Sequence, residues 1–547
     1  MSNDRPVDPS APFGLEGHVV TMNGRYDRLE RGVVYVAGSR IARVIASEAS
    51  PPRGFEEAPV IASGGTIYPG LIELHNHLSY NVLPLWSVPR RFDDRDQWSG
   101  GAMQETYRKT ISGPMSVLGR TPGLIEAVVR YVEAKCLLGG VTTSQGIALF
   151  SNQGAATYYQ GVVRNVERNG GDGLPPAGTR ISDVEATDAD AFLRRLQRSS
   201  CLLLHLAEGT GDAAREHFLS LHLRGDEWAV TKALAGIHCV ALQRADFEVM
   251  AERDAAMVWS PLSNLLLYGT TARIDQAKAA GLAIGIGSDW SPSGSKNLLG
   301  ELKAARLFDP GGDVFSDRQL IALATREAAR ILGWDTKLGT IQTGKRADLL
   351  VLNGRAGDPY QRLLHATETS VQLVVIDGVP RYGATDAMSR FDLGGTTERW
   401  TVGSSNRVLN LQDPAGNPVV GTLSLSEAAD RLEDAMGRLA DLARNLEHPS
   451  AELAARLVAG SGTQWMLLLD HEEPDGLDQR PHLPGPDGQP TAELTLDLAL
   501  AIKPLSELLE PISLDPLTVA DDDRFLARIA AEPNLPDALK QALPDLY

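Results

Sequence analysis

Two histidines separated by one residue carry the strongest chemical signal in the sequence. His75 and His77 follow the strand-like run Leu71–Leu74. In a strand, side chains two residues apart point to the same face, so both imidazoles can bind one metal ion. Taken alone, the pair is explained equally well as two surface histidines on a loop.

Three more residues of metal-binding type end other strand-like runs. His205 follows Cys201–Leu204, His238 follows Gly236-Ile237, and Asp289 follows Leu282–Ser288. Imidazole nitrogens and a carboxylate together form a donor set that suits Zn²⁺ or Fe²⁺. A parallel barrel keeps its active site at the carboxyl ends of its strands, and a buried core histidine seldom has such neighbours. The combination therefore predicts a metal site.

A carboxylate lies close to this predicted site. Glu208 comes three residues after His205, in a loop that should face the same end of the strands. A carboxylate beside a metal-bound water can carry a proton to a leaving nitrogen. Without the neighbouring histidines, Glu208 is interpreted more simply as an ordinary loop residue.

The elements that must position these residues change character along the chain. Residues 14–68 have the pattern of short strands with tight turns, and 337–382 form a second β-rich segment. Between them, strand-like runs alternate with helical patterns such as 122–138 and 316–332. This alternation predicts a parallel sheet, open or closed, flanked by two pieces of one small β domain.

The last part of the chain has a different pattern. Leucines recur every seven residues at Leu425, Leu432, Leu439 and Leu446. About three heptads favour an amphipathic helix packed on its own domain over an oligomerising coiled coil. Asp521–Asp523 is interpreted as a solvated helix start. We find no chemistry in residues 385–547.

Composition and charge exclude several classes of function. The chain of 547 residues has 52 basic and 70 acidic side chains, a net charge of −18, which argues against nucleic-acid or anionic-membrane partners. Its three cysteines lie far apart, as is typical of a reducing compartment. With no recognisable signal peptide and no long apolar run, we expect a cytoplasmic protein that acts on a small molecule.

The sequence resembles the amidohydrolase superfamily of metal-dependent hydrolases, nearest to the chlorohydrolase and aromatic deaminase branch. The resemblance covers roughly residues 14–384 and rests on seven motifs in the family's order. They are Pro69–His77, Gly139–Thr143, His205–Glu208, His238–Val240, Ser260–Asn264, Gly287–Asp289 and Gly344–Leu349.

The resemblance implies an α/β fold built on a (β/α)₈ TIM-like barrel over residues 69–332. The two flanks, 14–68 and 333–384, would form a composite small β-sandwich, followed by a C-terminal α+β extension over 385–547. Only about sixty residues separate Thr143 from His205, which is short for the units between those strands. We therefore expect an irregular barrel around strands 3 and 4.

The resemblance also implies roles for the candidate residues. His75, His77, His205 and Asp289 would bind one divalent metal, Zn²⁺ or Fe²⁺. His238 would hydrogen-bond the metal-bound water and polarise the substrate. Asp289 would also accept the proton of the water, and Glu208 would donate a proton to the departing group. Lys135 lies inside a helical pattern, so we do not expect a carbamylated lysine that bridges two metals.

The implied reaction is hydrolysis of a non-peptide C–N bond in a small, cyclic nitrogenous compound, with deamination as the first hypothesis. A cyclic amide or urea hydrolase, or a dehalogenase, would use the same site. A non-catalytic scaffold is the remote alternative, and such a protein is expected to lose metal ligands. The resemblance leaves a homo-oligomer open.

Residues that could contact the substrate lie in the stretch after His77, in the stretch after Asp289, and at Asn264. Aromatic and arginine side chains after His77 either sandwich a planar ring or pack against the barrel. These are Tyr80, Trp86, Arg90, Arg91, Trp98 and Tyr107. Asn264, Trp290, Lys296 and Asn297 are further candidates for the lining of the pocket.

Overall fold

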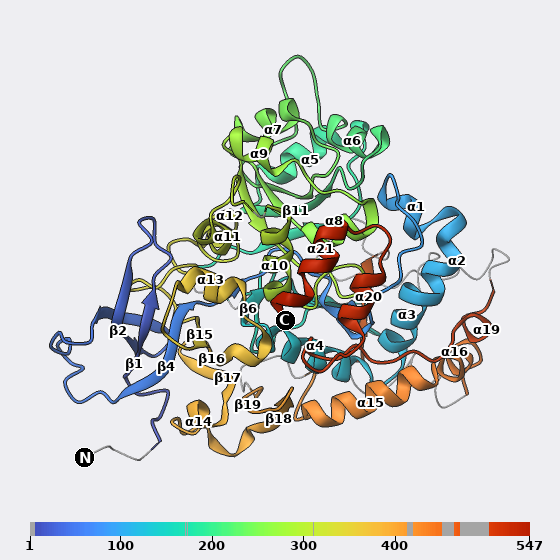
Figure 1. The fold of residues 1–547 in the computed structure, drawn as a ribbon. Helices are drawn as coiled ribbons and strands as arrows, with labels where there is room; N and C mark the ends of the chain where they lie inside the picture. Colours follow the sequence, from blue (N-terminus) through green and yellow to red (C-terminus); the bar gives the residue numbers. More distant parts are fainter. Residues whose placement is uncertain are drawn as a thin grey trace.

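Two groups of strands organise the chain, a mixed sheet at the N-terminal side and a set of parallel strands surrounded by helices (Figure 1). The computed structural model describes residues 6–169, 171, 173–309, 311–412, 419–450, 464–470 and 503–547. No helix within those ranges is long and apolar enough to cross a membrane.

A continuous nine-stranded sheet joins the two flanks of the β/α region. Its strand order is β18-β19-β17-β16-β15-β4-β1-β2-β3. The two flanks meet where β15 pairs antiparallel with β4, and β1 runs parallel to β4. The strands are β1 (Phe13–Val20), β2 (Arg28–Ala37), β3 (Arg40–Ala46), β4 (Val60–Pro69), β15 (Leu349–Asn353), β16 (Val371–Ile376), β17 (Val379–Ala384), β18 (Glu398–Val402) and β19 (Ser405–Leu409).

This sheet differs in two ways from the predicted small sandwich. Its strands are hydrogen-bonded as one sheet, and buried side chains such as Val34, Ile67 and Val351 share one core. The sheet also continues past residue 384, because β19 pairs with the outer edge of β17 and satisfies its backbone groups. Strands β18 and β19 therefore belong to a segment that the sequence assigned to the C-terminal extension.

Eight short parallel strands form two further sheets in the described residues. One has the order β5-β6-β9 and the other the order β10-β11-β12-β13-β14. The strands are β5 (Leu71–Ile72), β6 (Val141–Ser144), β9 (Arg164–Asn165), β10 (Ala177–Arg180), β11 (Cys201–Leu206), β12 (Leu234–His238), β13 (Ala256–Trp259) and β14 (Ala283–Ile286).

Backbone hydrogen bonds bring the edges of these two sheets together at both ends. The Ala177 N–H donates to the Val166 carbonyl at 2.9 Å, which joins the β9 and β10 edges. On the other side, Leu74 N–H donates to Ile286 O at 3.4 Å and Asp289 N–H donates to His75 O at 3.0 Å. This arrangement is barrel-like, and it brings the two ligand-bearing chain segments after β5 and β14 side by side.

Helices pack outside the parallel strands, and several match the predicted patterns. The helix expected over 122–138 is α4 (Ile125–Leu138), and the pattern at 316–332 forms two helices, α11 (Asp317–Leu323) and α12 (Arg326–Ile331). The others that follow strands are α5 (Ala189–Leu196), α6 (Asp212–Leu219), α7 (Arg244–Ala251), α8 (Pro261–Tyr268), α9 (Ile274–Ala279) and α10 (Leu298–Phe308).

The connections around the third and fourth strands are irregular. Between β6 and β9 the chain forms a hairpin, β7 (Ala148–Ser151) and β8 (Ala156–Tyr158), and the described residues from β6 to β10 contain no helix. The short interval from Thr143 to His205 therefore reflects a missing pair of helices. The β7 edge of this hairpin pairs with a strand of the C-terminal segment, β20 (Trp465–Leu467).

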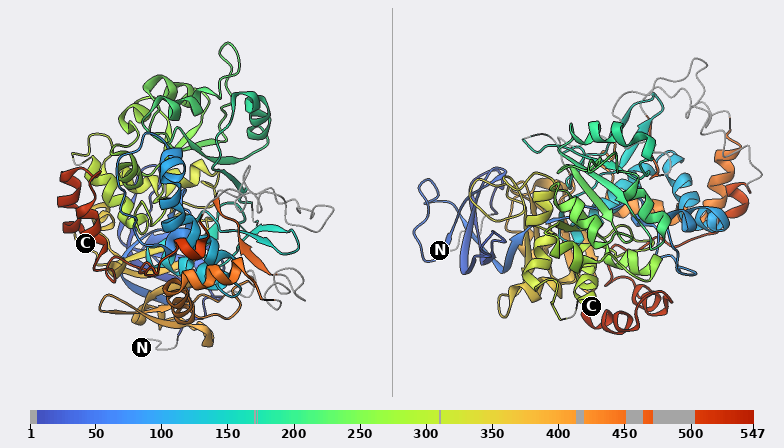
Figure 2. Two further views of the ribbon diagram at one scale, coloured as in Figure 1. Left: turned by 90° about the vertical axis from the view of Figure 1, so that its right-hand side faces the viewer. Right: turned by 90° about the horizontal axis from the view of Figure 1, so that it is seen from above.

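The C-terminal segment packs directly on the β/α region rather than on a domain of its own. Helix α15 (Leu425–Gly437) contacts α4, and the buried guanidinium of Arg130 in α4 donates to the Leu423 carbonyl just before α15. The heptad pattern continues into a second helix, α16 (Leu439–Glu447), after a break at Arg438. Further on, α20 (Phe525–Ala531) and α21 (Asp537–Ala542) lie on the outside of the molecule, with α21 against α10 (Figures 1 and 2).

Four buried charges connect the C-terminal segment to the barrel-like core. The Asp515 carboxylate lies 2.5 Å from Lys135 Nζ and 2.6 Å from Lys296 Nζ, and Lys296 also pairs with Asp522 at 2.8 Å. The two lysines and two aspartates balance in charge, as buried ions must. Two expectations are therefore wrong, because Lys296 pairs with these aspartates instead of lining a pocket, and Asp522 is buried instead of solvated.

Removing the central carboxylate of this network should destabilise the protein strongly. In Asp515→Ala, Lys135 loses its buried carboxylate partner and Lys296 loses one of two, which should cost about 3–5 kcal/mol and lower the thermal midpoint. The matched control is Asp434→Ala on α15, whose exposed carboxylate pairs with Arg438. Equal melting temperatures for the two variants would show that the network is not stabilising.

Candidate metal centre

The predicted ligands and His238 come from four strand ends on one side of the parallel strands. His75 and His77 follow β5, His205 lies in β11, and His238 is the last residue of β12. Asp289 lies three residues past the end of β14. The backbone of His238 and of Asp289 is left-handed, with φ of 68° and 66°, a conformation that is costly for residues other than glycine. Such strain often marks a functional site.

Donor atoms from these residues converge on one point. His77 Nε2 lies 3.3 Å from His205 Nε2, and Asp289 Oδ1 lies 3.1 Å from His75 Nε2 and 3.4 Å from His77 Nε2. Two nitrogens that bind one tetrahedral Zn²⁺ are separated by about 3.3 Å. The buried His75 Nε2 makes no hydrogen bond to the described residues. The donor set and its spacing therefore fit one divalent metal.

The outer nitrogens of these three imidazoles all face acceptors. His75 Nδ1 lies 3.0 Å from Gln145 Oε1, whose orientation is fixed because it also accepts from the Asn76 N–H. His205 Nδ1 lies 3.4 Å from the Arg180 carbonyl, and His77 Nδ1 lies 2.8 Å from Asp470 Oδ2. In the neutral form of each ring, Nδ1 therefore carries the proton and Nε2 presents its lone pair to the point of convergence.

His238 has the opposite tautomer. The Trp259 indole can only donate, and it donates to Thr271 Oγ1, which in turn donates to Asn264 Oδ1. The Asn264 amide nitrogen must then donate to His238 Nδ1, 2.9 Å away. A neutral His238 therefore carries its proton on Nε2, which faces the site 3.7 Å from Glu208 Oε2. This ring presents an N–H donor to the site, whereas the other three present a lone pair.

Glu208 is buried beside His238, and only one of its two carboxylate oxygens accepts a hydrogen bond from the described residues. Its Oε1 accepts a hydrogen bond of 2.8 Å from the Tyr268 hydroxyl, which itself accepts from Trp98 Nε1 at 3.0 Å. Its Oε2 makes no hydrogen bond to the described residues, and Arg95 Nη1 is 4.0 Å away. No pattern in the sequence indicated that Tyr268 and Arg95 are partners of Glu208.

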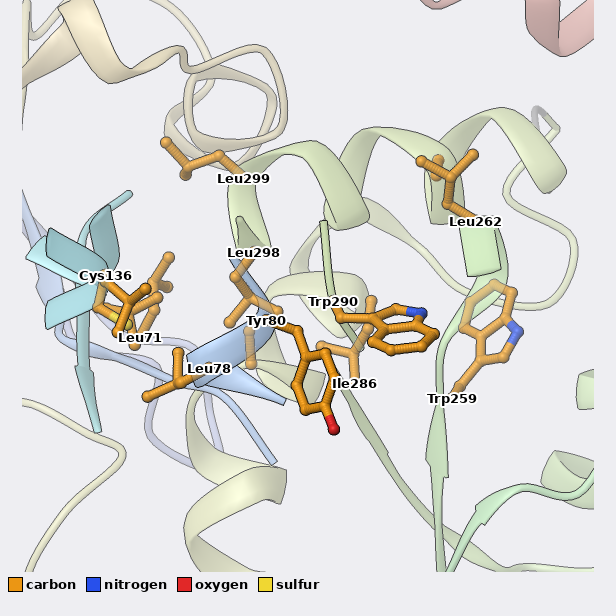
Figure 3. Packing of buried hydrophobic residues seen from close by; sticks show 14 of the residues in the cluster. Leu71, Leu78, Tyr80, Cys136, Trp259, Leu262, Ile286, Trp290, Leu298 and Leu299 are labelled. Carbon is orange, nitrogen blue, oxygen red and sulfur yellow. The ribbon is translucent and has the colours of Figure 1, made fainter. Parts of the chain in front are cut away.

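The predicted aromatic residues divide into two groups. Trp290 lies beside His77, with 5.6 Å between the ring centroids, and contacts Trp98 at 5.8 Å. It also contacts Tyr80 at 5.4 Å (Figure 3). Tyr107 packs on Trp98. This first group forms an aromatic wall next to the predicted ligands.

The second group packs away from the convergent atoms. Trp86 stacks on Phe92, the guanidinium of Arg90 lies over the same ring, and Arg91 packs against Gly269. Neither of the other pocket candidates lines the site, since Asn264 binds His238 and the Asn297 side chain caps α10. The packing interpretation of the long stretch after His77 therefore holds for this second group, and contact of the first group with a planar ring stays a prediction.

Asp470 is the residue that sequence reasoning missed altogether. It ends the apolar run Trp465–Leu469, as His205 ends the run Cys201–Leu204, so the same pattern of a polar residue after a strand could have indicated it. Asp470 lies more than 380 residues from His77 in the sequence, so no local pattern indicated that the two side chains are in contact.

Burial and charge set the protonation of the site. Burial lowers the pKa of the His205 imidazole well below its ordinary value and also lowers that of His238. Burial raises the pKa of Asp289, but the neighbouring imidazoles more than offset this and keep it ionised. For His77, burial lowers the pKa, whereas the carboxylates of Asp470, Asp289 and Glu208 raise it to about 9.

Comparisons with known proteins show what more than half of the chain is similar to. A family model described as "Amidohydrolase family" matches residues 66–381. A 5-methylthioadenosine/S-adenosylhomocysteine deaminase of Symbiobacterium thermophilum is 24% identical over 390 residues, which cover 62% of this chain and 84% of that protein. A 5'-deoxyadenosine deaminase of Methanothermobacter thermautotrophicus is 25% identical and covers 64% of this chain and 89% of that protein.

Among solved structures, atrazine chlorohydrolase from Arthrobacter aurescens complexed with zinc is similar in fold. The TM-score is 0.53 at 20% identity, over 67% of this chain and 94% of that one. The likeness supports a TIM-barrel-like α/β fold for the matched part of the chain.

Metal affinity should depend on pH through His77. A protonated imidazole cannot bind a metal, so below the His77 pKa of about 9 each binding event releases a proton from this ring. Zinc affinity should therefore rise about tenfold per pH unit from pH 7 to 9 and then level off. Competition with a calibrated chelator measures it. Affinity that stays constant over this range, after correction for the chelator, would contradict a protonated His77.

Proposed function

Because the chain belongs to the amidohydrolase family, we propose that it is a metal-dependent hydrolase that removes ammonia from a small cyclic nitrogenous compound. The observation that carries the proposal is the contrast between tautomers. Three imidazoles present lone pairs to one point, while His238 presents an N–H and Glu208 an unpartnered oxygen beside them.

In this proposal His75, His77, His205 and Asp289 hold one divalent metal, Zn²⁺ or Fe²⁺. When bound, such a metal lowers the pKa of a coordinated water and so supplies a nucleophile at neutral pH. A bridging lysine plays no part, since Lys135 is engaged with Asp515.

The protein's own groups would move the protons. Asp289 is held by Ser263, whose hydroxyl donates to Oδ2 at 2.6 Å, and its ionised carboxylate accepts the proton of the attacking water. His238 Nε2–H donates a hydrogen bond that orients the water and polarises the substrate. Glu208, when its carboxyl group is protonated, would then deliver that proton from Oε2 to the departing nitrogen, and the proton taken up by Asp289 would replace it. A departing halide needs no such proton, so the buried Glu208 favours an amine or ammonia over a halide.

The substrate class is supported by the aromatic wall and by the relatives. Trp290, Tyr80 and Trp98 pack on one another beside His77, and aromatic side chains can pack against planar rings. The similar proteins are named for deamination of adenine nucleosides and for hydrolysis of triazines. We therefore place a ring with an exocyclic amine first, and a cyclic amide or urea second. A cytoplasmic location, the absence of nucleic-acid and membrane partners, and the oligomeric state stay predictions.

Ammonia release identifies the reaction. Zinc-loaded protein should release ammonia from at least one class in a panel of amino-substituted purines, pterins, pyrimidines, triazines and guanidines. His238→Ala removes the N–H donor and should lower kcat at least 100-fold. No ammonia from protein that carries one metal per chain would overturn deamination in favour of amide or urea hydrolysis.

Replacing the proton donor should affect turnover more than binding. Glu208→Gln keeps the shape and the Tyr268 contact but cannot deliver a proton, so we expect kcat to fall by about 10²–10⁴ with KM within about threefold. Glu252→Gln, at an exposed carboxylate, is the matched control and should leave both constants unchanged. An unaltered kcat in Glu208→Gln would remove this residue from the mechanism.

A further inference from the structure

We propose that residues 464–470 complete the metal centre, with Asp470 as a positioning residue that holds His77 in its metal-binding orientation. The inference rests on the proposed function only in taking His77 as a ligand. It adds a contribution from a segment that lies outside the matched residues 66–381.

The contact is short and specific. His77 Nδ1 lies 2.8 Å from Asp470 Oδ2, so the ring donates to a carboxylate while its Nε2 faces the other donors. A carboxylate behind a ligating imidazole fixes the tautomer and the ring angle and makes Nε2 a stronger donor. The corresponding acceptors of His75 and His205 are neutral, an amide and a backbone carbonyl. Asp470 is thus the charged acceptor in the described set.

His77 needs this support more than the other ligands do. Its side chain is 13% exposed, whereas that of His75 is fully buried. A partly exposed imidazole is less restricted by packing and can rotate away from the site. The hydrogen bond to Asp470 adds a directional restriction to the packing of His77 against Trp290.

A strand of the C-terminal segment brings Asp470 to this position. Strand β20 (Trp465–Leu467) pairs antiparallel with β7, the outer strand of the irregular hairpin. Leu467 and Leu469 are buried, and Gly119 in α3 (Gly113–Arg120) permits close packing, since a Cβ there would lie 2.7 Å from Leu467 Cβ. The segment is therefore docked by backbone pairing and apolar contacts.

A second part of the C-terminal segment supports the ligand-bearing loops from behind. Lys135, paired with Asp515, also donates to the Asn81 carbonyl at 2.9 Å and to Ser291 Oγ at 2.8 Å. Asn81 Nδ2 donates to Asn76 Oδ1, between the two histidines of the first loop. The described C-terminal residues thus contact His77 directly through Asp470 and hold Lys135, which supports the loops of His75–His77 and of Asp289.

The experiment measures zinc affinity of the full-length protein by chelator competition. All variants are measured at one pH, so the differences between them report on the strength and orientation of the ligand. Asp470→Asn is isosteric but lacks the charge, and Asp470→Glu is the conservative rescue. Asp434→Asn on α15 is the matched control at an exposed carboxylate.

We expect Asp470→Asn to bind zinc about 10–100-fold more weakly, with the melting temperature of the metal-free protein unchanged. Asp470→Glu should recover part of the affinity, and Asp434→Asn should equal the wild type. Zinc affinity of Asp470→Asn within twofold of the wild type would overturn the inference while leaving the proposed function intact. A wild-type protein that binds no zinc would overturn both, and that outcome is seen before any variant is measured.

Discussion

A buried imidazole has two ring nitrogens, and four such rings meet at one point in this protein. Each outer nitrogen needs a partner away from water, because an unpaired buried polar group costs free energy. The partners differ: an amide oxygen, a backbone carbonyl and a carboxylate face three rings, and an amide nitrogen faces the fourth. The partner of each outer nitrogen decides whether the ring presents a lone pair or a proton to the centre. The residues that surround the four histidines therefore determine the chemistry of the centre.

These surrounding residues come from distant parts of the chain. Gln145 follows β6, Arg180 ends β10, and Asn264 lies in α8, so several strand-to-helix units contribute to one centre. The fourth partner comes from a segment that the parallel strands do not include. The missing helices between β6 and β10 matter here, because the hairpin that replaces them offers its edge to β20. An irregularity in the barrel-like core thus becomes a docking position for the C-terminal segment.

The sequence predicted the centre better than its surroundings. The residues His75, His77, His205, His238 and Asp289 follow recognisable strands, so their common location follows from the topology of parallel strands alone. The heptad leucines likewise indicated a buried face on α15, but a local pattern does not identify what covers that face, which is α4. Asp470, Asp515 and Asp522 could not be assigned because each finds its partner hundreds of residues away. A single aspartate has the same local signature whether it is solvated or buried against a lysine.

The pairing of β20 with β7 also has a consequence for the order of assembly. Residues 152 and 464, which hydrogen-bond across this junction, are 312 positions apart. During synthesis the parallel strands, with His75 through Asp289, leave the ribosome long before Asp470 and Asp515 do, and domains generally fold from the N-terminal side. Contacts so far apart in sequence form slowly, because a long loop must close first. The nascent chain would therefore carry a clustered but unsupported set of histidines, and the centre would reach its final geometry only after the C-terminal segment has docked.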